Sequence, residues 1–346
     1  MSDSKSRISI CQFGVVDQHQ IDLIRIHNNK GAFVDLINYG AGIKAIVIPN
    51  KDALPINRIL GFDTLEEYIN DTSYVGSTIG PYANRIANAE FSINSNKYKL
   101  FANDGVNCNH GGFDGFNTKI FDYKCDNDRV CFTYFRKDGE GGFPGNLKFD
   151  VTYSFNHNNR LTIKYYAQTD RSSILSPTNH AYFNLSGGLI SGIDHSLTLF
   201  SDSYLEFDKN FLPTGTIQKV DNTPFDFRQK KIIAQAIKQL LSQSRALKGF
   251  NEYFIKSEAS SKLLASIEDP ITQMRLDIYS SFPGCQFYTG DYLHSPSKEK
   301  RGFQAFDGIC LEPHYFPNLR PCSTASSILT PQSHFRELIE YQFVDI

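Results

Sequence analysis

Short apolar runs that alternate with polar residues recur along most of the chain, between turns rich in Gly, Pro, Asn and Asp. Alternation with a period of two, as in Leu-Thr-Ile-Lys-Tyr at 161–165, buries one face of a strand and leaves the other in solvent. These runs predict strands at Ile8–Phe13, Phe33–Asn38, Ile43–Pro49, Phe149–Phe155, Leu161–Ala167, Ser196–Phe200, Met274–Phe282 and Gln286–Thr289. The 18 Tyr and 28 Phe residues agree, because aromatic rings favour half-buried pleated surfaces.

One segment, Lys230–Ser244, has helical rather than strand periodicity. Ile233, Ile237, Leu240 and Leu241 fall at helical spacing there, which predicts a surface helix on an otherwise β architecture. The 346 residues contain no linker, low-complexity stretch or convincing internal repeat. We therefore predict one domain, residues 1–346, that is all-β: a large antiparallel β-sandwich with a few short helices.

The charge balance narrows the class of ligand. Lys and Arg number 35 against 37 Asp and Glu, a formal net charge of −2, so nothing favours nucleic acid or an anionic membrane as partner. No run approaches the roughly 20 apolar residues of a membrane helix, and residues 1–7 lack the apolar core of a signal peptide. We expect a cytoplasmic monomer or homodimer that binds a small neutral molecule, and neither nucleic acid nor membrane.

The cysteines and histidines show no metal-binding or disulfide pattern. Seven cysteines, at positions 11, 108, 125, 131, 285, 310 and 322, include no C-x-x-C pair. The nine histidines show no H-x-x-x-H or H-E-x-x-H spacing. We therefore expect free thiols in a reducing compartment and no metal.

Four stretches combine Gly or Pro with side chains that donate, accept or exchange protons. In residues 79–86, Asn84 and Arg85 offer the donors and acceptors that a polyhydroxylated ligand needs, although a turn with a solvated Arg is the alternative. In residues 107–113, two glycines follow His110 and permit a close backbone approach. A lone His is more often structural, so this stretch alone does not define a site.

The other two stretches contain candidates for proton transfer. Residues 176–185 place polar side chains in what should be a buried strand, where each costs about 1–3 kcal/mol unless it is hydrogen-bonded. His180 in this stretch exchanges a proton near neutral pH. In residues 308–317, Glu312 follows an apolar tripeptide, and partial desolvation raises a carboxyl pKa toward that of a general base. A salt-bridged structural Glu is the alternative.

Other catalytic motifs are missing from the sequence. The chain has no Gly-x-Ser-x-Gly elbow, no P-loop and no Gly-x-Gly-x-x-Gly after a predicted strand. Their absence disfavours α/β-hydrolase, phosphoryl-transfer and redox functions.

Taken in this order, the four stretches make the chain resemble the aldose 1-epimerase (galactose mutarotase) family over nearly its whole length. The resembling segments are Asn38–Gly42, Leu60–Glu66, Ala83–Ile86, Asn109–Gly112, Thr178–Leu185, Pro213–Gly215, Pro224–Arg228, Pro283–Gly290 and Cys310–Glu312. The resemblance implies a β-sandwich of galactose-mutarotase type. It also implies interconversion of the α and β anomers of free aldohexoses, such as glucose and galactose, without cofactor or metal.

The resemblance further implies the roles of individual residues. Glu312 corresponds to the catalytic base and His180 to the catalytic acid, and sugar contacts are implied for Asn84, Arg85, His110, Asn251 and Gln286. One position departs, because the family's Gly-aromatic-Asp-His segment reads Gly249-Phe250-Asn251-Glu252 here. Asn keeps the shape of Asp and one acceptor but lacks its charge, so this departure bears on affinity or sugar choice more than on reaction type.

The chemistry of these residue types fits the implied reaction. A carboxylate can remove the C1 hydroxyl proton while an imidazolium protonates the ring oxygen, which opens the hemiacetal to an aldehyde. Two other hypotheses stay open. One is an epimerase of sugar phosphates, which calls for extra basic residues round the pocket. The other is a non-catalytic sugar-binding regulatory module in which the Asn251 substitution has blunted catalysis.

Overall fold

The computed structural model describes residues 7–242, 248–258, 262–296, 302–317 and 327–346. Antiparallel pairing joins the strands of its three larger sheets, as in the pairs at the centre of each. This confirms the predicted all-β class and the antiparallel architecture. No helix in the described ranges has both the length and the apolarity needed to cross a bilayer.

The largest sheet in the described residues has nine strands, in the order β11-β12-β13-β14-β28-β24-β23-β18-β21. Its strands are β11 (Asp122–Asp126), β12 (Arg129–Arg136), β13 (Leu147–Phe155), β14 (Arg160–Thr169), β18 (Ser196–Leu199), β21 (Lys231–Ile232), β23 (Leu263–Asp269), β24 (Met274–Ser280) and β28 (Phe335–Asp345). Four of the predicted strands lie here. The long strand β28 was not among the predicted strands, although Ile339, Tyr341 and Phe343 alternate with polar residues. It joins the two halves of the sheet by pairing with β14 and β24.

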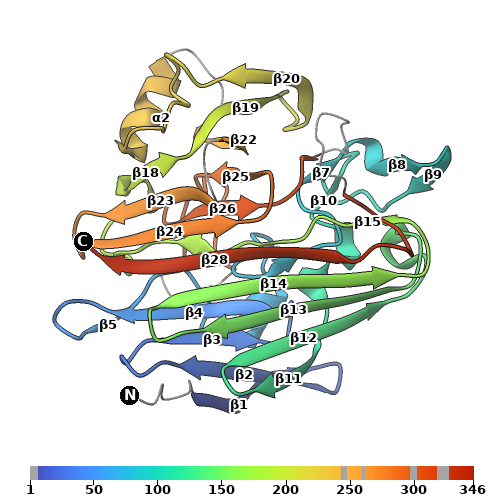
Figure 1. The fold of residues 1–346 in the computed structure, drawn as a ribbon, viewed down its shortest axis with the longest axis horizontal. Coiled ribbons are helices and arrows are strands. Elements are labelled where there is room, and N and C mark those ends of the chain that lie inside the picture. The colour runs from blue at the N-terminus through green and yellow to red at the C-terminus, as the bar shows by residue number, and fades with distance from the viewer. Residues whose placement is uncertain (1–6, 243–247, 259–261, 297–301, 318–326) are drawn as a thin grey trace.

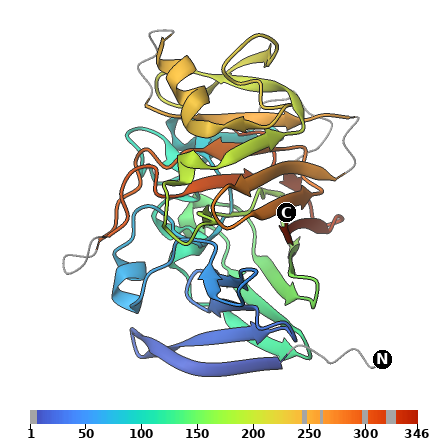
Figure 2. The same ribbon diagram turned by 90° about the vertical axis from the view of Figure 1, so that its left-hand side faces the viewer.

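Two further sheets complete the β architecture, and Figures 1 and 2 show the N-terminal one at the bottom of the molecule. The N-terminal sheet, blue in the figures, has the order β1 (Arg7–Val16), β2 (His19–His27), β3 (Phe33–Ile37), β4 (Gly42–Pro49) and β5 (Pro55–Asn57). The other sheet has the order β17 (Tyr182–Phe183), β26 (Ile309–Pro313), β25 (Gly284–Tyr288), β22 (Asn251–Lys256), β19 (Ser201–Phe207) and β20 (Pro213–Lys219). This second sheet carries the candidate base and is called the site sheet below.

Short elements connect the sheets. The two-stranded pairs are β6 (Thr78–Ile79) with β16 (Thr178–Asn179), β7 (Arg85–Ile86) with β10 (Cys108–Asn109), β8 (Glu90–Ile93) with β9 (Asn96–Lys99), and β15 (Ser173–Ile174) with β27 (Ile328–Leu329). The helices are α1 (Leu65–Ile69), α2 (Ile233–Ser242) and the 3-10 turns η1 (Ala87–Ala89), η2 (Gly112–Asp114), η3 (Phe116–Thr118), η4 (Glu140–Gly142) and η5 (Gly192–Asp194). Helix α2 confirms the predicted surface helix over Ile233–Ser242, although Lys231 and Ile232 form strand β21 instead and Leu241 is exposed. The last predicted residue, Ser244, lies outside the described residues.

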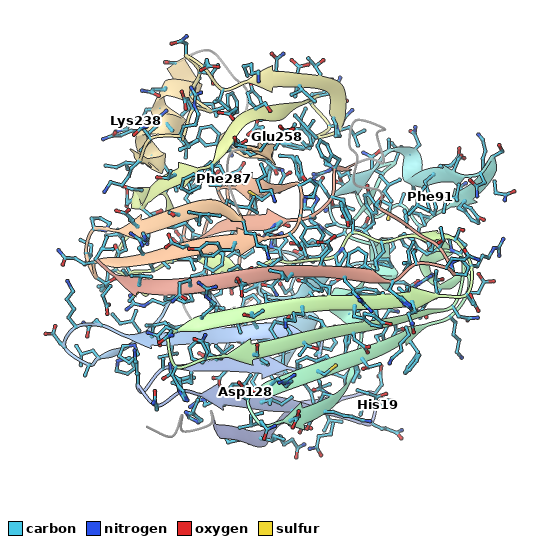
Figure 3. The ribbon with its side chains drawn as sticks, viewed as in Figure 1. His19, Phe91, Asp128, Lys238, Glu258 and Phe287 are labelled. Atoms are coloured by element: carbon cyan, nitrogen blue, oxygen red, sulfur yellow. The ribbon has the colours of Figure 1, made fainter. Side chains whose placement is uncertain are left out.

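The core follows from the alternation seen in the sequence. Phe149, Val151 and Tyr153 of β13 are fully buried, whereas the residues between them are partly exposed. The same cluster reaches Phe287 of the site sheet, which Figure 3 shows inside the molecule. Each large apolar side chain buried in this way contributes about 1.5–3 kcal/mol to folding, so the core fixes the strands on which the polar stretches stand.

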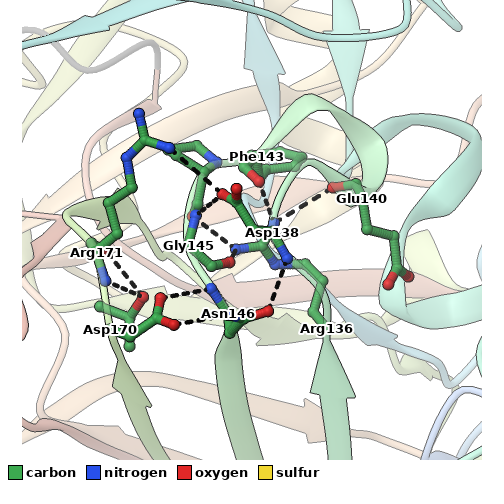
Figure 4. Close-up of polar contacts among 10 residues, drawn as sticks. Arg136, Asp138, Glu140, Phe143, Gly145, Asn146, Asp170 and Arg171 are labelled. Carbon is green, nitrogen blue, oxygen red and sulfur yellow. Dashed lines mark hydrogen bonds and ion pairs between the residues drawn. The ribbon is translucent and has the colours of Figure 1, made fainter.

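A buried guanidinium orders the loop that follows β12. Arg136 donates hydrogen bonds to the carbonyl oxygens of Phe143 (2.6 Å), Pro144 (2.9 Å) and Gly145 (2.8 Å), as Figure 4 shows in part. Burial lowers the pKa of Arg136 to about 10, so it remains charged at neutral pH. One side chain therefore satisfies several carbonyl groups that the loop removes from water.

This loop lies against the turn that follows His110. Lys119 bridges the two segments through ion pairs with Asp114 (3.1 Å) and Glu140 (3.0 Å). The two segments pack closely at Gly141, because a Cβ at that position would come within 3.3 Å of the Asp114 side chain. The Arg136 network therefore supports the turn that carries His110.

We predict that Arg136→Met lowers the free energy of unfolding by about 2–4 kcal/mol, because buried carbonyl groups lose charge-assisted hydrogen bonds. Urea denaturation measures the loss. Arg171→Met is the matched control, since Arg171 pairs with Asp138 across 3.7 Å while about half of its side chain is exposed. The control should lose at most about 1 kcal/mol, and equal losses in the two variants would contradict the assigned role of Arg136.

Candidate active site

The four polar stretches meet at one cavity of about 650 Å³. All seven residues singled out in the sequence line it: Asn84, Arg85, His110, His180, Asn251, Gln286 and Glu312. They come from segments up to about 230 residues apart, so only the fold brings them together. Their individual roles stay predictions at this point.

Strand alternation on the site sheet places three of these side chains on the same face. Gln286 of β25 lies opposite Glu312 of β26, and Asn251 of β22 lies opposite Tyr288. Residues directly opposite in an antiparallel pair share a face. The intervening Phe287 and Leu311 point to the other face and belong to the core, so the packing that anchors the strands also aims the polar groups into the cavity.

His180 is held by its own backbone between β16 and β17. Its N–H donates to the carbonyl of Ser77 (3.0 Å), and its carbonyl accepts from the N–H of Gly76 (3.0 Å). The ring nitrogen Nε2 lies 3.7 Å from Oε1 of Glu312, and both side chains are almost completely buried. The other nitrogen, Nδ1, is 3.5 Å from Sγ of Cys310. The imidazole is therefore fixed beside the carboxyl group.

Burial reverses the usual order of the pKa values of Glu312 and His180. Desolvation raises the pKa of Glu312 to about 8, and nearby Arg85 opposes part of that shift. Desolvation lowers the pKa of His180 to about 4. Between these values the pair holds one proton, which rests on Glu312 in the empty site. The form with Glu312 ionised and His180 protonated has the same proton count, so the pair titrates as a unit.

His110 is a neutral hydrogen-bond donor. Its Nδ1 accepts a hydrogen bond from the backbone N–H of Asn84 (3.3 Å), so the ring proton resides on Nε2. Burial, followed by the effect of His180, keeps the pKa of His110 well below its usual value. Its ring meets that of His180 edge-on, with centroids 5.4 Å apart, and packs against Tyr74 at 4.7 Å.

Arg85 stands at the edge of the same cavity with its charge paired. Its Nε lies 2.6 Å from Oδ2 of Asp104, and its guanidinium lies 5.0 Å above the ring of Phe211. The carboxylate and the ring restrict the side chain to one orientation. This pairing reduces the free positive charge that the cavity offers an anionic ligand.

His110, His180 and Glu312 could also share a metal ion, since one donor atom from each lies within 4.8 Å of the others. Sequence spacing could not reveal this set, because its members belong to three separate stretches. Ligation through His110 Nε2 would require the other ring tautomer and would break the hydrogen bond from Asn84. As built, the site suits hydroxyl groups better than a cation, and the expected absence of a metal stays a prediction.

Sequence reasoning missed several residues that line the cavity: Tyr74, Asp104, Lys209, Phe211 and Tyr288. Phe211 comes just before the Pro213–Gly215 segment already identified, and Asp104 precedes a glycine, so local turn patterns marked both positions. Tyr74 gave no such indication. Its contact with His110 arises only from the fold.

Comparison with known proteins agrees with this geometry. The family model described as aldose 1-epimerase matches residues 22–341. The chain is 33% identical to the aldose 1-epimerase of Escherichia coli K12 over 93% of this chain and 95% of that protein. It is 33% identical to human galactose mutarotase over 88% of this chain and 87% of that one. A solved aldose epimerase homologue from C. elegans superposes with a TM-score of 0.87 at 28% identity, covering 94% and 99% of the two chains.

The raised pKa of Glu312 predicts a pH-dependent cost in stability. The folded chain retains a proton that the unfolded chain releases above pH 4.5, so the free energy of unfolding falls as pH rises from about 4.5 to about 8. Glu312→Gln cannot ionise. The melting temperature of this variant minus that of the native chain should therefore increase by at least about 2 °C between pH 5 and pH 8.5.

Thermal denaturation across this pH range measures the gain. Glu66→Gln, on the exposed side of α1, is the matched control and should track the native chain at every pH. If the difference for Glu312→Gln did not change with pH, the carboxyl group would not have the raised pKa assigned to it.

Proposed function

The chain belongs to the aldose 1-epimerase family of isomerases, and on that basis we propose that it interconverts the α and β anomers of free aldohexoses such as galactose and glucose. The observation that carries the proposal is the buried pair of Glu312 and His180, 3.7 Å apart in a cavity lined by hydrogen-bonding groups. Glu312 acts as general base and His180 as general acid.

The reaction needs two proton transfers and no net change in protons. Ionised Glu312 takes the proton of the C1 hydroxyl, and protonated His180 gives its proton to the ring oxygen as the bond between C1 and that oxygen breaks. The product is the open-chain aldehyde. Rotation about the C1–C2 bond presents the other carbonyl face, and the reverse transfers close the ring and restore both residues.

The surrounding residues favour this chemistry. His110 offers its Nε2–H to an oxygen of the sugar, and Arg85 places a cation near the oxygens at which negative charge develops. Glu312 and His180 are almost completely buried, so fixed protein dipoles replace part of the water around the reacting atoms. Acid–base groups positioned in this way contribute about 10²- to 10⁴-fold each to the rate.

A polarimetric assay on freshly dissolved α-D-galactose and α-D-glucose tests the proposal. The protein should accelerate the approach to anomeric equilibrium well above the rate in buffer. If sugar binds but the rate stays that of buffer, the protein is a sugar-binding module instead. If only sugar phosphates are accelerated, the substrate class is wrong.

We predict that Glu312→Gln lowers kcat by about 10²- to 10⁴-fold, because the variant cannot accept the C1 proton. His180→Asn should cause a loss of similar size, because Asn has no proton to give the ring oxygen. Combining the two changes should cost little more than either alone, since the two groups act together. Near-normal turnover of Glu312→Gln would remove Glu312 from the role of base.

The shared proton also predicts a pH profile. The active form of the pair holds one proton, so kcat/KM should be nearly constant between pH values of about 4 and about 8. Below this range the pair gains a second proton, and above it the pair loses its only one, so activity falls about tenfold per pH unit on each side. A profile that rises through pH 8 would contradict this protonation state.

A further inference from the structure

Three side-chain amides form a hydrogen-bonded chain along one wall of the cavity. The backbone N–H of Arg85 donates to Oδ1 of Asn84 at 2.7 Å. Nδ2 of Asn84 donates to Oε1 of Gln286 at 3.0 Å, and Nε2 of Gln286 donates to Oδ1 of Asn251 at 2.6 Å. Asn84 and Gln286 are buried, and Asn251 is half-buried.

The first hydrogen bond fixes the direction of all the others. A backbone N–H only donates, so the oxygen of Asn84 must face Arg85 and its nitrogen must face Gln286. The same reasoning orients Gln286 and then Asn251. Each of the three amide oxygens in this hydrogen-bonded series already accepts a hydrogen bond. The series ends on Nδ2 of Asn251, for which the described residues provide no acceptor.

Asn251 therefore presents a donor to the cavity. An Asp at this position would accept from Gln286 with one oxygen and offer its second oxygen to the ligand as an acceptor. The two side chains have the same shape but opposite hydrogen-bonding character at the ligand. A hydroxyl group can satisfy either one, whereas an ether oxygen, a fluorine or a carboxylate can satisfy only the donor.

We propose that Asn251 determines substrate specificity by donating a hydrogen bond to the group of the aldose that contacts it. The protein then accepts aldoses in which that hydroxyl group is replaced by one that can accept a hydrogen bond but cannot donate one. This inference rests on the proposed function. The inference adds two kinds of substrate. One is a substituted hexose whose acceptor group is neutral, and the other is a hexuronic acid, whose acceptor group is anionic. Free hydroxyl sugars remain substrates.

Deoxyfluoro sugars test the proposal, because fluorine keeps the size of a hydroxyl group but has no proton to donate. The parent sugar is whichever of galactose and glucose the protein turns over faster, and its 2-, 3-, 4- and 6-deoxyfluoro analogues are compared with it. The readout is kcat/KM for each analogue relative to the parent, in the native chain and in Asn251→Asp. Intrinsic differences in ring-opening rate cancel, because both proteins receive the same sugars.

At one carbon of the sugar the fluoro-to-parent ratio of Asn251→Asp should fall about tenfold or more below that of the native chain, because the carboxylate then faces a group that cannot donate. The other positions should respond equally in the two proteins. Equal ratios at every position would overturn the proposal. A melting curve establishes that Asn251→Asp is folded.

The matched control is Asn210→Asp, which makes the same chemical change at an exposed residue of the cavity lining that forms none of the hydrogen bonds of the amide chain. It should leave the fluoro-to-parent ratios unchanged. A loss in this variant equal to that in Asn251→Asp would assign the effect to added negative charge and overturn the role of Asn251.

A hexuronate carries its carboxylate at C6, so a response confined to C2, C3 or C4 assigns a neutral acceptor. When the responsive position is C6, the corresponding hexuronate distinguishes the two sources of an acceptor. If its relative kcat/KM also falls about tenfold in Asn251→Asp but not in Asn210→Asp, the subsite takes an anionic acceptor. If only the fluoro sugars respond, the subsite takes a neutral one. Should the native chain turn over none of these sugars, the proposed function fails, and the same ratios measured as Kd by calorimetry still decide the character of Asn251.

Discussion

The site depends on one proton shared by a carboxyl group and an imidazole that are both removed from water. Burial disfavours the charged form of each group, so the pKa of Glu312 rises to about 8 and that of His180 falls to about 4. Neither group alone would then be in its reactive form at neutral pH. Because they lie 3.7 Å apart, the proposed mechanism lets the proton that rests on the carboxyl group move to the imidazole when a sugar binds.

The rest of the fold keeps this pair buried and oriented. Apolar residues on the far face of the site sheet anchor the strands that carry Glu312 and Gln286, and backbone hydrogen bonds hold His180 between two short strands. Behind His110, the Arg136 loop and the Lys119 ion pairs support the turn. The buried carboxyl group of Glu312 costs stability, and the large apolar core compensates for that cost.

Much of this was predictable from the sequence, for physical reasons. Period-two alternation identified strands such as β13 and β14, since one of their faces packs into the core. Polar residues beside or inside apolar stretches marked His180 and Glu312 as candidates, because burying them demands partners, and the family resemblance supplied their roles. Strand β28 was missed although its residues alternate, but its place between β14 and β24 could not be predicted, because strand order follows from packing. The contact of Tyr74 with His110 was not predictable either, because no local pattern records contacts between distant segments. The direction of the amide chain that ends at Asn251 likewise needed atomic positions.

The most direct test of the account is the ionisation state of Glu312 in the empty protein. Infrared difference spectra between the native chain and Glu312→Gln, recorded from pH 5 to pH 10, isolate the band of this one carboxyl group. The account predicts a protonated carboxyl band at pH 7 that gives way to a carboxylate band with a midpoint near pH 8. A carboxylate band that is already complete at pH 6 would contradict the shared proton on which the proposed mechanism rests.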